Sequence, residues 1–229
     1  KANMAVLMAM VKPGETIQVA IEFETKMPMV FARTGFRKDF YLVGQWFPKV
    51  GVWETAGFRY STQGAWNCHQ FHANSEFFAN FGRYDVELTV PSEMVIGATG
   101  EQTKRVENVS NRTTTYRFHQ EDVTDFAWTV QPNYIRVERM FEAGKETTAA
   151  EIAAEAKLQG IAEDDVRLSD VKMIVLMQPE HGEQIERTFD ATRNAIKHFG
   201  LWYGRYPYKT ITVVDPPNAG SNNTLTICS

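Results

Sequence analysis

Short segments in which apolar and polar residues alternate recur along the first two thirds of the chain. A period of two is typical of half-buried β-strands, because successive side chains of a strand point to opposite faces of its sheet. Turn-forming residues such as Pro91 and Gly100 separate neighbouring segments. The alternating segments are 16–24, 40–43, 84–90, 94–98, 113–119, 126–130 and 134–137. This pattern predicts a mainly β fold, built as an antiparallel β-sandwich or a large antiparallel sheet.

The pattern changes near residue 147. Residues 148–151 match a capping box at the start of a segment rich in Ala, Glu and Lys, and Gly160 ends that segment. A short exposed helix is expected there. The apolar run 171–177 then predicts a buried strand, and 210–214 predicts another that ends at an Asp-Pro-Pro sequence.

A helix from about residue 179 to residue 199 is expected between these two strands, with Ile185, Phe189, Ile196 and Phe199 on one face. A strand, a helix and a strand in succession indicate a small α/β region after the β domain. We place the boundary near residues 165–172. The predicted domains are 1–168 and 169–229.

Composition excludes several classes of protein. The chain has 229 residues, a formal net charge of −4 and two cysteines, Cys68 and Cys228. Nucleic-acid binding is disfavoured, because it needs clustered Lys and Arg. No apolar stretch reaches the roughly 18 uncharged residues of a membrane span. Two distant cysteines indicate neither a disulfide framework nor a Cys-rich zinc site, and the cellular compartment stays open.

The histidines do not predict a metal site. His69 and His72 are spaced i, i+3 in a polar segment, whereas zinc on one helix face needs His at i and i+4 with a base between them. A polar turn or edge strand is the better interpretation. His119 with Glu121 and Asp122 could add ligands only if the fold brought these residues close to the pair. No metal ligand is therefore assigned.

Residue patterns for catalysis are also missing from the sequence, which has no G-x-S-x-G, G-x-x-x-x-G-K-[ST] or G-x-G-x-x-G motif. Asp122 and Asp125 are interpreted as turn residues whose carboxylates accept backbone N–H groups, in preference to a general acid and base. His181 and His198 are expected to lie near the ends of the late helix. No catalytic residue is assigned.

Four blocks of sequence, each weak alone, together resemble the aminopeptidase N family of zinc metallopeptidases, the gluzincins. The second block contains a Phe-Gly-x-Tyr-Asp-Val strand, and the last runs into Val-Asp-Pro-Pro-x-Ala-Gly. The blocks follow the family's order across almost the whole chain. They are 44–52, 80–86 with 90–91 and 98–100, 122–128, and 199–217 with its continuation to Gly220.

The resemblance implies that residues up to about 170 form the family's saddle-like N-terminal β domain, an antiparallel β-sandwich. The later residues would open the thermolysin-like catalytic domain as a truncated α/β stub. Family members hydrolyse N-terminal peptide bonds with zinc held by an H-E-x-x-H helix and a downstream Glu. This sequence has no H-E-x-x-H. The zinc, and the peptide substrate that it acts on, are thus expected of a parent enzyme, and this chain is expected to hold no cofactor and to be inactive alone.

The resemblance also implies candidate substrate-binding residues. The family's strand beyond Asp-Pro-Pro pairs with the peptide backbone, and its Glu receives the free α-amine. Ala219 and Gly220 match this strand, while Asn222 stands where Met is expected and Asn223 where the Glu is expected. An amide can hydrogen-bond an amine but cannot neutralise its charge. Gln45 matches a family Gln near the first substrate side chain.

Departures from the family pattern leave alternatives open. Phe47 falls where many members carry Glu or Gln. The divergent stretch 221–229 fits a truncated product, a shifted reading frame, a cloning artefact or a degenerate relative. The alternative function is a stand-alone, non-catalytic β domain that binds peptides or protein partners through sheet edges. An exposed apolar face at Phe189, Ile196, Phe199 and Trp202 would favour self-association.

Overall fold

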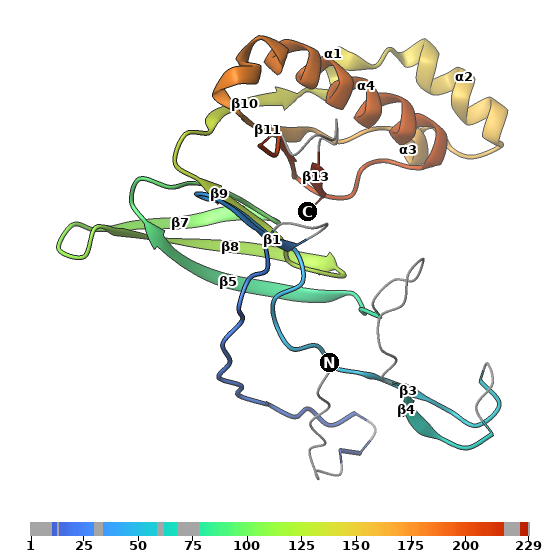
Figure 1. Cartoon of the computed structure of the whole chain (residues 1–229). Coiled ribbons are helices and arrows are strands. Elements are labelled where there is room, and N and C mark those ends of the chain that lie inside the picture. The colour runs from blue at the N-terminus through green and yellow to red at the C-terminus, as the bar shows by residue number, and fades with distance from the viewer. Residues whose placement is uncertain are drawn as a thin grey trace. The chain divides into compact units, whose positions relative to one another are not determined.

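The computed structural model describes residues 11–12, 14–29, 34–58, 62–67, 78–217 and 225–228. The chain forms two compact units, each described here by itself. The first unit comprises Lys1–Lys26 and Trp46–Asn80, and the second comprises Met27–Gln45 and Phe81–Ser229. Figure 1 shows the elements of both.

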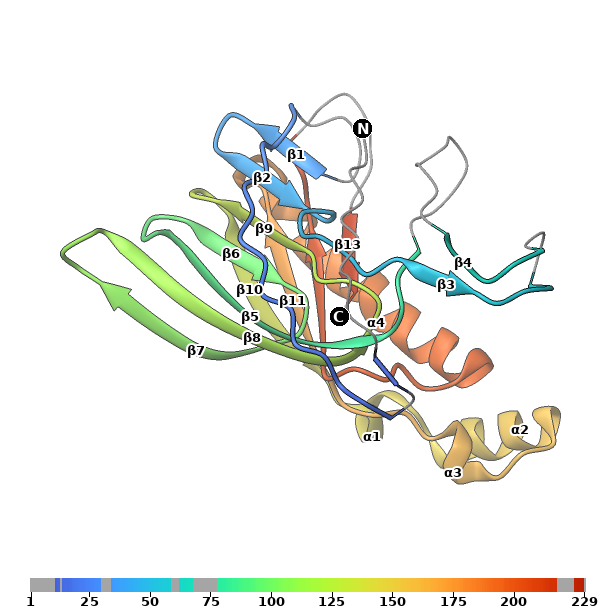
Figure 2. The same cartoon turned by 90° about the horizontal axis from the view of Figure 1, so that it is seen from below.

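The described residues of the second unit form three β-sheets. The first has the order β1-β2-β9-β6 and is antiparallel throughout. Its strands are β1 (Thr34–Arg37), β2 (Phe40–Val43), β9 (Trp128–Gln131) and β6 (Val95–Ala98). The second sheet, also antiparallel, has the order β5-β8-β7 and forms a long curved ribbon in Figure 2. Its strands are β5 (Gly82–Pro91), β8 (Thr113–Val123) and β7 (Glu101–Asn108).

The third sheet has the order β10-β11-β12-β13. Only β11 and β12 run parallel within it; the other two pairs are antiparallel. Its strands are β10 (Ile135–Phe141), β11 (Val171–Met177), β12 (Thr210–Val214) and β13 (Leu225–Cys228). The architecture is mainly β with a small α/β part, as predicted. The strand β10 lies before the predicted domain boundary at residue 168, but it pairs with β11, which lies after that boundary.

In the described part of this unit, five helices connect or cover these strands. They are α1 (Ala143–Glu146), α2 (Ala149–Gln159), α3 (Glu163–Val166), the 3₁₀ helix η1 (Pro179–Gln184) and α4 (Ile185–Tyr203). The late helix was expected to begin as an α-helix at about residue 179. The first six residues are instead a 3₁₀ turn, in which His181 leaves helical geometry, and α4 then continues to Tyr203.

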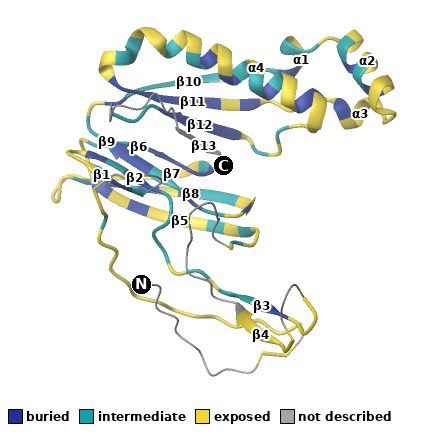
Figure 3. Cartoon of the chain, turned by 45° about the vertical axis from the view of Figure 1, so that its right-hand side comes forward, coloured by how far each residue is buried: buried dark blue, intermediate teal, exposed yellow. Residues whose placement is uncertain are grey.

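The strand β11 is buried on both faces from Met173 to Met177, which explains its apolar sequence there, whereas Lys172 near its start is exposed. On one face Val171, Met173 and Val175 pack with Phe189 and Ile196 of α4. On the other, Ile174 and Leu176 join a second core with residues that include Phe40 and Leu42 of β2. Figure 3 shows β11 and β12 largely buried and the outer side of α4 exposed.

The capping box predicted for α2 is present. The Thr148 Oγ1 accepts a hydrogen bond from the backbone N of Glu151 at 3.2 Å, and the Glu151 carboxylate accepts one from the backbone N of Thr148 at 2.8 Å. Lys197 of α4 binds the same carboxylate at 2.8 Å. These hydrogen bonds, that of Lys197 first, lower the pKa of Glu151 to about 2. Gly160 ends the helix at φ 69°.

Thr148→Ala should lower the free energy of unfolding by about 1 kcal/mol. The backbone N of Glu151 loses its acceptor, the Thr148 hydroxyl, and the Glu151 carboxylate is no longer held in place by that hydroxyl. Urea unfolding followed by circular dichroism measures this. Thr148→Ser keeps the hydroxyl and should stay close to wild type. A loss as large in Thr148→Ser as in Thr148→Ala would contradict the capping role.

Two sequence predictions fail in the described residues. Residues 16–24 were expected to form a half-buried strand, but they form no strand, and Ile17, Val19 and Ile21 are exposed. Alternation produces a strand only where a neighbouring backbone pairs with it. The predicted apolar face of α4 is also only partly exposed. Phe189 and Ile196 are buried, whereas Phe199 and Trp202 are 59% and 49% exposed.

The first unit contains a two-stranded antiparallel hairpin of β3 (Val52–Glu54) and β4 (Ala65–Asn67). Trp53 and Trp66 lie directly opposite each other, with ring centroids 5.5 Å apart in an edge-to-face arrangement. Such cross-strand aromatic pairs stabilise two-stranded sheets.

None of the helices in the described part of the chain has the length and hydropathy needed to span a membrane.

Candidate functional site

The carboxyl ends of the parallel strands β11 and β12 lie beside each other, since Leu176 of β11 is in register with Val214 of β12. Gln178 follows β11 and Asp215 follows β12. In α/β sheets, ligands bind outside the carboxyl ends of parallel strands. This edge of the third sheet is therefore the first place where a functional site is expected.

A polar network occupies this edge. Gln178 is 1% exposed. Its side-chain amide exchanges two hydrogen bonds of 2.8 Å with the amide of Gln131, at the end of β9. Its backbone N donates to Asp215 Oδ2 at 3.1 Å, and its Nε2 also donates to the Asp215 carbonyl at 2.9 Å. The network links the first sheet to the ends of both parallel strands and fixes the chain where it leaves β12.

His181, in η1, completes the network. Its Nδ1 lies 2.7 Å from Asp215 Oδ2, and the two side chains are 27% and 14% exposed. The hydrogen bond and the negative charge of Asp215 raise the pKa of His181 above its ordinary value, and Glu180 adds a smaller effect of the same sign. Sequence analysis had placed His181 at a helix end. Its actual contact is the carboxylate at the end of β12.

The His181–Asp215 pair makes stability depend on pH. Because the folded-state pKa of His181 is raised, its contribution is complete below the unfolded value of about 6.5 and is lost as the pH rises through the folded value. The urea midpoint of wild type should therefore exceed that of His181→Gln most at about pH 5.5 and least at about pH 9. His198→Gln, whose ring contacts Trp202, is the control. A wild-type advantage that grows with pH would contradict this assignment.

The loop after β2 and the loop after β8 meet at a second polar contact. The side chain of Gln45 donates from Nε2 to Oδ2 of Asp125. The Thr34 hydroxyl accepts from the backbone N of Gly44 at 3.1 Å and of Gln45 at 2.9 Å, so β1 fixes the start of this loop. Asp125 Oδ1 accepts from the backbone N of Phe126 at 2.9 Å, which confirms its predicted turn role. Its contact with Gln45 was not predicted.

Gln45 is the one predicted substrate-binding residue that falls within the described residues. Ala219, Gly220, Asn222 and Asn223 lie outside them, as do His69 and His72. Among the described residues, Val214 at the end of β12 is in register with Leu225 at the start of β13.

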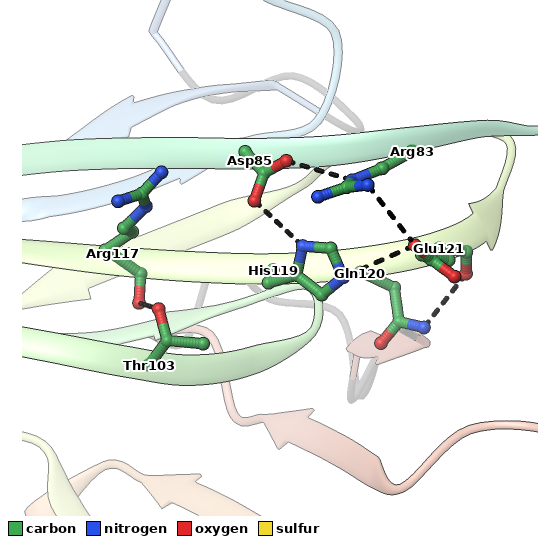
Figure 4. A network of polar contacts seen from close by, with 7 residues as sticks. All are labelled: Arg83, Asp85, Thr103, Arg117, His119, Gln120 and Glu121. Atoms are coloured by element: carbon green, nitrogen blue, oxygen red, sulfur yellow. Dashed lines mark hydrogen bonds and ion pairs between the residues drawn. The ribbon is translucent and has the colours of Figure 1, made fainter.

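A third polar cluster lies on the exposed face of the second sheet (Figure 4). Asp85 of β5 is in register with His119 of β8, and the Asp85 Oδ1 is 2.8 Å from the His119 Nδ1. Arg83 binds both Asp85, at 3.1 Å, and Glu121, at 3.7 Å. The hydrogen bond from His119, and then those of Arg83, lower the pKa of Asp85. A cation here would have to displace the guanidinium, so the cluster is a cross-strand ion-pair network.

The described residues do not fit a zinc ion. Within the part of the chain that the structure describes, His, Cys, Asp and Glu side chains form no group of three or more suited to hold a metal. Asp122, considered as a ligand with His119 and Glu121, instead contributes its carbonyl oxygen, which accepts from the Tyr208 hydroxyl at 2.7 Å.

No protein-family model matches the chain, and no curated protein matches it.

Two contacts were not predicted for residues that the sequence had singled out, Gln45 with Asp125 and His181 with Asp215. The partners are separated by 80 and 34 residues, respectively. One signal was available for the second: Asp215 directly follows one predicted strand and His181 lies four residues after the other, and a βαβ unit would place these two strands side by side. No local pattern marks the first.

Proposed function

We propose that this chain is part of a zinc-dependent aminopeptidase of the aminopeptidase N type, comprising its N-terminal β domain and the start of its thermolysin-like domain. The observation that carries the proposal is the strand–helix–strand unit of β11, α4 and β12, which follows the antiparallel sheets and ends at Asp215-Pro216-Pro217. This is the position at which the fourth resembling block, 199–217, leads toward the family's substrate strand.

The chemistry of the parent enzyme belongs to residues that this chain does not contribute. Zinc, an H-E-x-x-H helix and its downstream Glu would supply hydrolysis of the first peptide bond. The proposed contribution of this chain is to hold the peptide through Gln45 and through Ala219, Gly220, Asn222 and Asn223. With an amide at Asn223, that strand offers a hydrogen bond to the α-amine but no opposite charge.

The reading frame that encodes this chain tests the proposal. It should continue beyond Ser229 into a segment that encodes H-E-x-x-H with a downstream Glu. If the frame instead closes at Ser229 and the purified chain folds and captures peptides, the stand-alone β domain becomes the better function. The exposed edges of that module would be β5 and β7, the outer strands of the second sheet.

Self-association of the isolated chain is proposed through the aromatic residues at the end of α4. Phe199, Trp202 and Tyr203 are 59%, 49% and 82% exposed, and their rings contact one another with centroids 6.2–6.5 Å apart. Exposed clusters of this kind favour association. Light scattering should show a concentration-dependent mass that Trp202→Ser reduces. A monomer at all concentrations, with no binding of hydrophobic dyes, would exclude this.

A further inference from the structure

The amide of Gln45 is fixed in one orientation. Its backbone N donates to the Thr34 hydroxyl at 2.9 Å, and its Nε2 donates to Asp125. An ionised carboxylate only accepts hydrogen bonds, so the nitrogen of the amide, and not its oxygen, must face Asp125. The Oε1 of Gln45 therefore lies on the opposite side of the amide, and no donor among the described residues contacts it.

Asp125 is itself held in place. Its Oδ1 accepts from the backbone N of Phe126 at 2.9 Å, and the Phe126 side chain is fully buried. The ring of Tyr84 packs against Phe126 with centroids 6.2 Å apart. Burial, and then the negative charge of Asp125, raise the pKa of Tyr84. The negative charge of Asp125 thus acts on neighbouring groups as well as on Gln45.

These contacts determine which ligands Gln45 can accept. With Nε2 engaged, the amide presents only an acceptor, and the adjacent carboxylate adds a negative potential. Such a site suits a cationic hydrogen-bond donor and disfavours a carboxylate or a carbonyl oxygen. In the opposite amide orientation, the NH₂ group would face the ligand and repel an ammonium.

We propose that Asp125 is a positioning residue that holds Gln45 as an acceptor for the free ammonium group of a bound peptide. This inference rests on the proposed function, because it deepens the role of Gln45 in substrate binding. Asp125 does not contact the ligand in this account. It acts by orienting the amide and by making the local potential negative.

Nuclear magnetic resonance of the ¹⁵N-labelled 229-residue chain tests the proposal. The probes are leucinamide, which carries a free ammonium, and N-acetyl-leucinamide, in which that group is blocked. Leucinamide should shift the side-chain NH₂ signals of Gln45, and N-acetyl-leucinamide should not. Asp125→Asn should weaken leucinamide binding about tenfold, because the hydrogen bond from Gln45 to the ammonium loses both its fixed amide orientation and the adjacent negative charge. Asp125→Glu, which restores the carboxylate, should recover part of the affinity.

Asp122→Asn is the matched control, because it makes the same change at an exposed side chain near the end of β8, three residues before Asp125, and should leave the affinity unchanged. The proposal is overturned by equal responses to the two ligands, by no response of Gln45, or by unchanged affinity in Asp125→Asn. If Asp125→Asn does not fold, the titrations of the wild-type chain with leucinamide and with N-acetyl-leucinamide still test whether Gln45 binds a free ammonium group. Failure of the aminopeptidase proposal itself is seen separately, in the zinc content and turnover of the longer protein.

Discussion

Phe189→Ala should lower the free energy of unfolding of the second unit by about 3–5 kcal/mol, the range for truncating a buried aromatic side chain. Phe189 is fully buried in the core between α4 and the third sheet, with Met173 and Val175 among its neighbours. The guanidinium of Arg139 lies 4.4 Å from its ring centroid, and that arginine also binds Glu186. Truncation leaves a cavity that these neighbours cannot fill.

Urea unfolding followed by circular dichroism measures the loss. Phe199→Ala is the control, because it makes the same change ten residues further along α4 at an exposed position. That variant should stay within about 0.5 kcal/mol of wild type. Equal losses in the two variants would show that α4 does not cover the sheet with the face described.

Gly100→Ala should be the second strongly destabilising change, at about 2–5 kcal/mol. Gly100 has φ +86° in the turn between β6 and β7, and a Cβ there would lie 2.4 Å from the carbonyl oxygen of His119. The left-handed conformation costs an L-residue about 1–2 kcal/mol, and a clash with backbone adds about 1–3 kcal/mol. The neighbouring Thr99 is fixed by hydrogen bonds with Ala127, so the turn cannot relax easily.

Gly160→Ala separates the two contributions. Gly160 has φ +69°, but nothing lies within 4 Å of the position of its Cβ. Only the conformational cost of about 1–2 kcal/mol should appear there. Thermal and urea unfolding of both variants would test the difference. A Gly100→Ala variant no less stable than Gly160→Ala would contradict the close approach of Gly100 to β8.

Much of the second unit could be predicted from its sequence. The apolar run 171–177 became β11 with the predicted bounds, and Thr148 caps α2 as expected. Both signals are local: a doubly buried strand needs only apolar residues, and a capping box needs only two residues three positions apart. The alternation in 16–24 is equally regular but forms no strand, because pairing depends on a partner that the segment itself does not contain.

The candidate site was harder to predict, because its contacts join distant residues. Gln45 was singled out by resemblance, but its orientation depends on Asp125, which the sequence marks only as a turn residue. His181 was predicted at a helix end, whereas its position in a 3₁₀ turn brings it to Asp215. Such pairings follow from how strands and loops are arranged in space, and one sequence carries no direct record of that arrangement.

We propose that this chain is part of a zinc aminopeptidase whose metal and catalytic residues lie outside these 229 residues. Elemental zinc analysis beside hydrolysis of a panel of aminoacyl chromogenic amides tests it most directly. The 229-residue chain should hold no stoichiometric zinc and show no turnover, whereas the longer protein that carries it should show both. Stoichiometric zinc with turnover in the 229-residue chain would contradict the account, and His69, His72 and His119 would then be the ligands to replace.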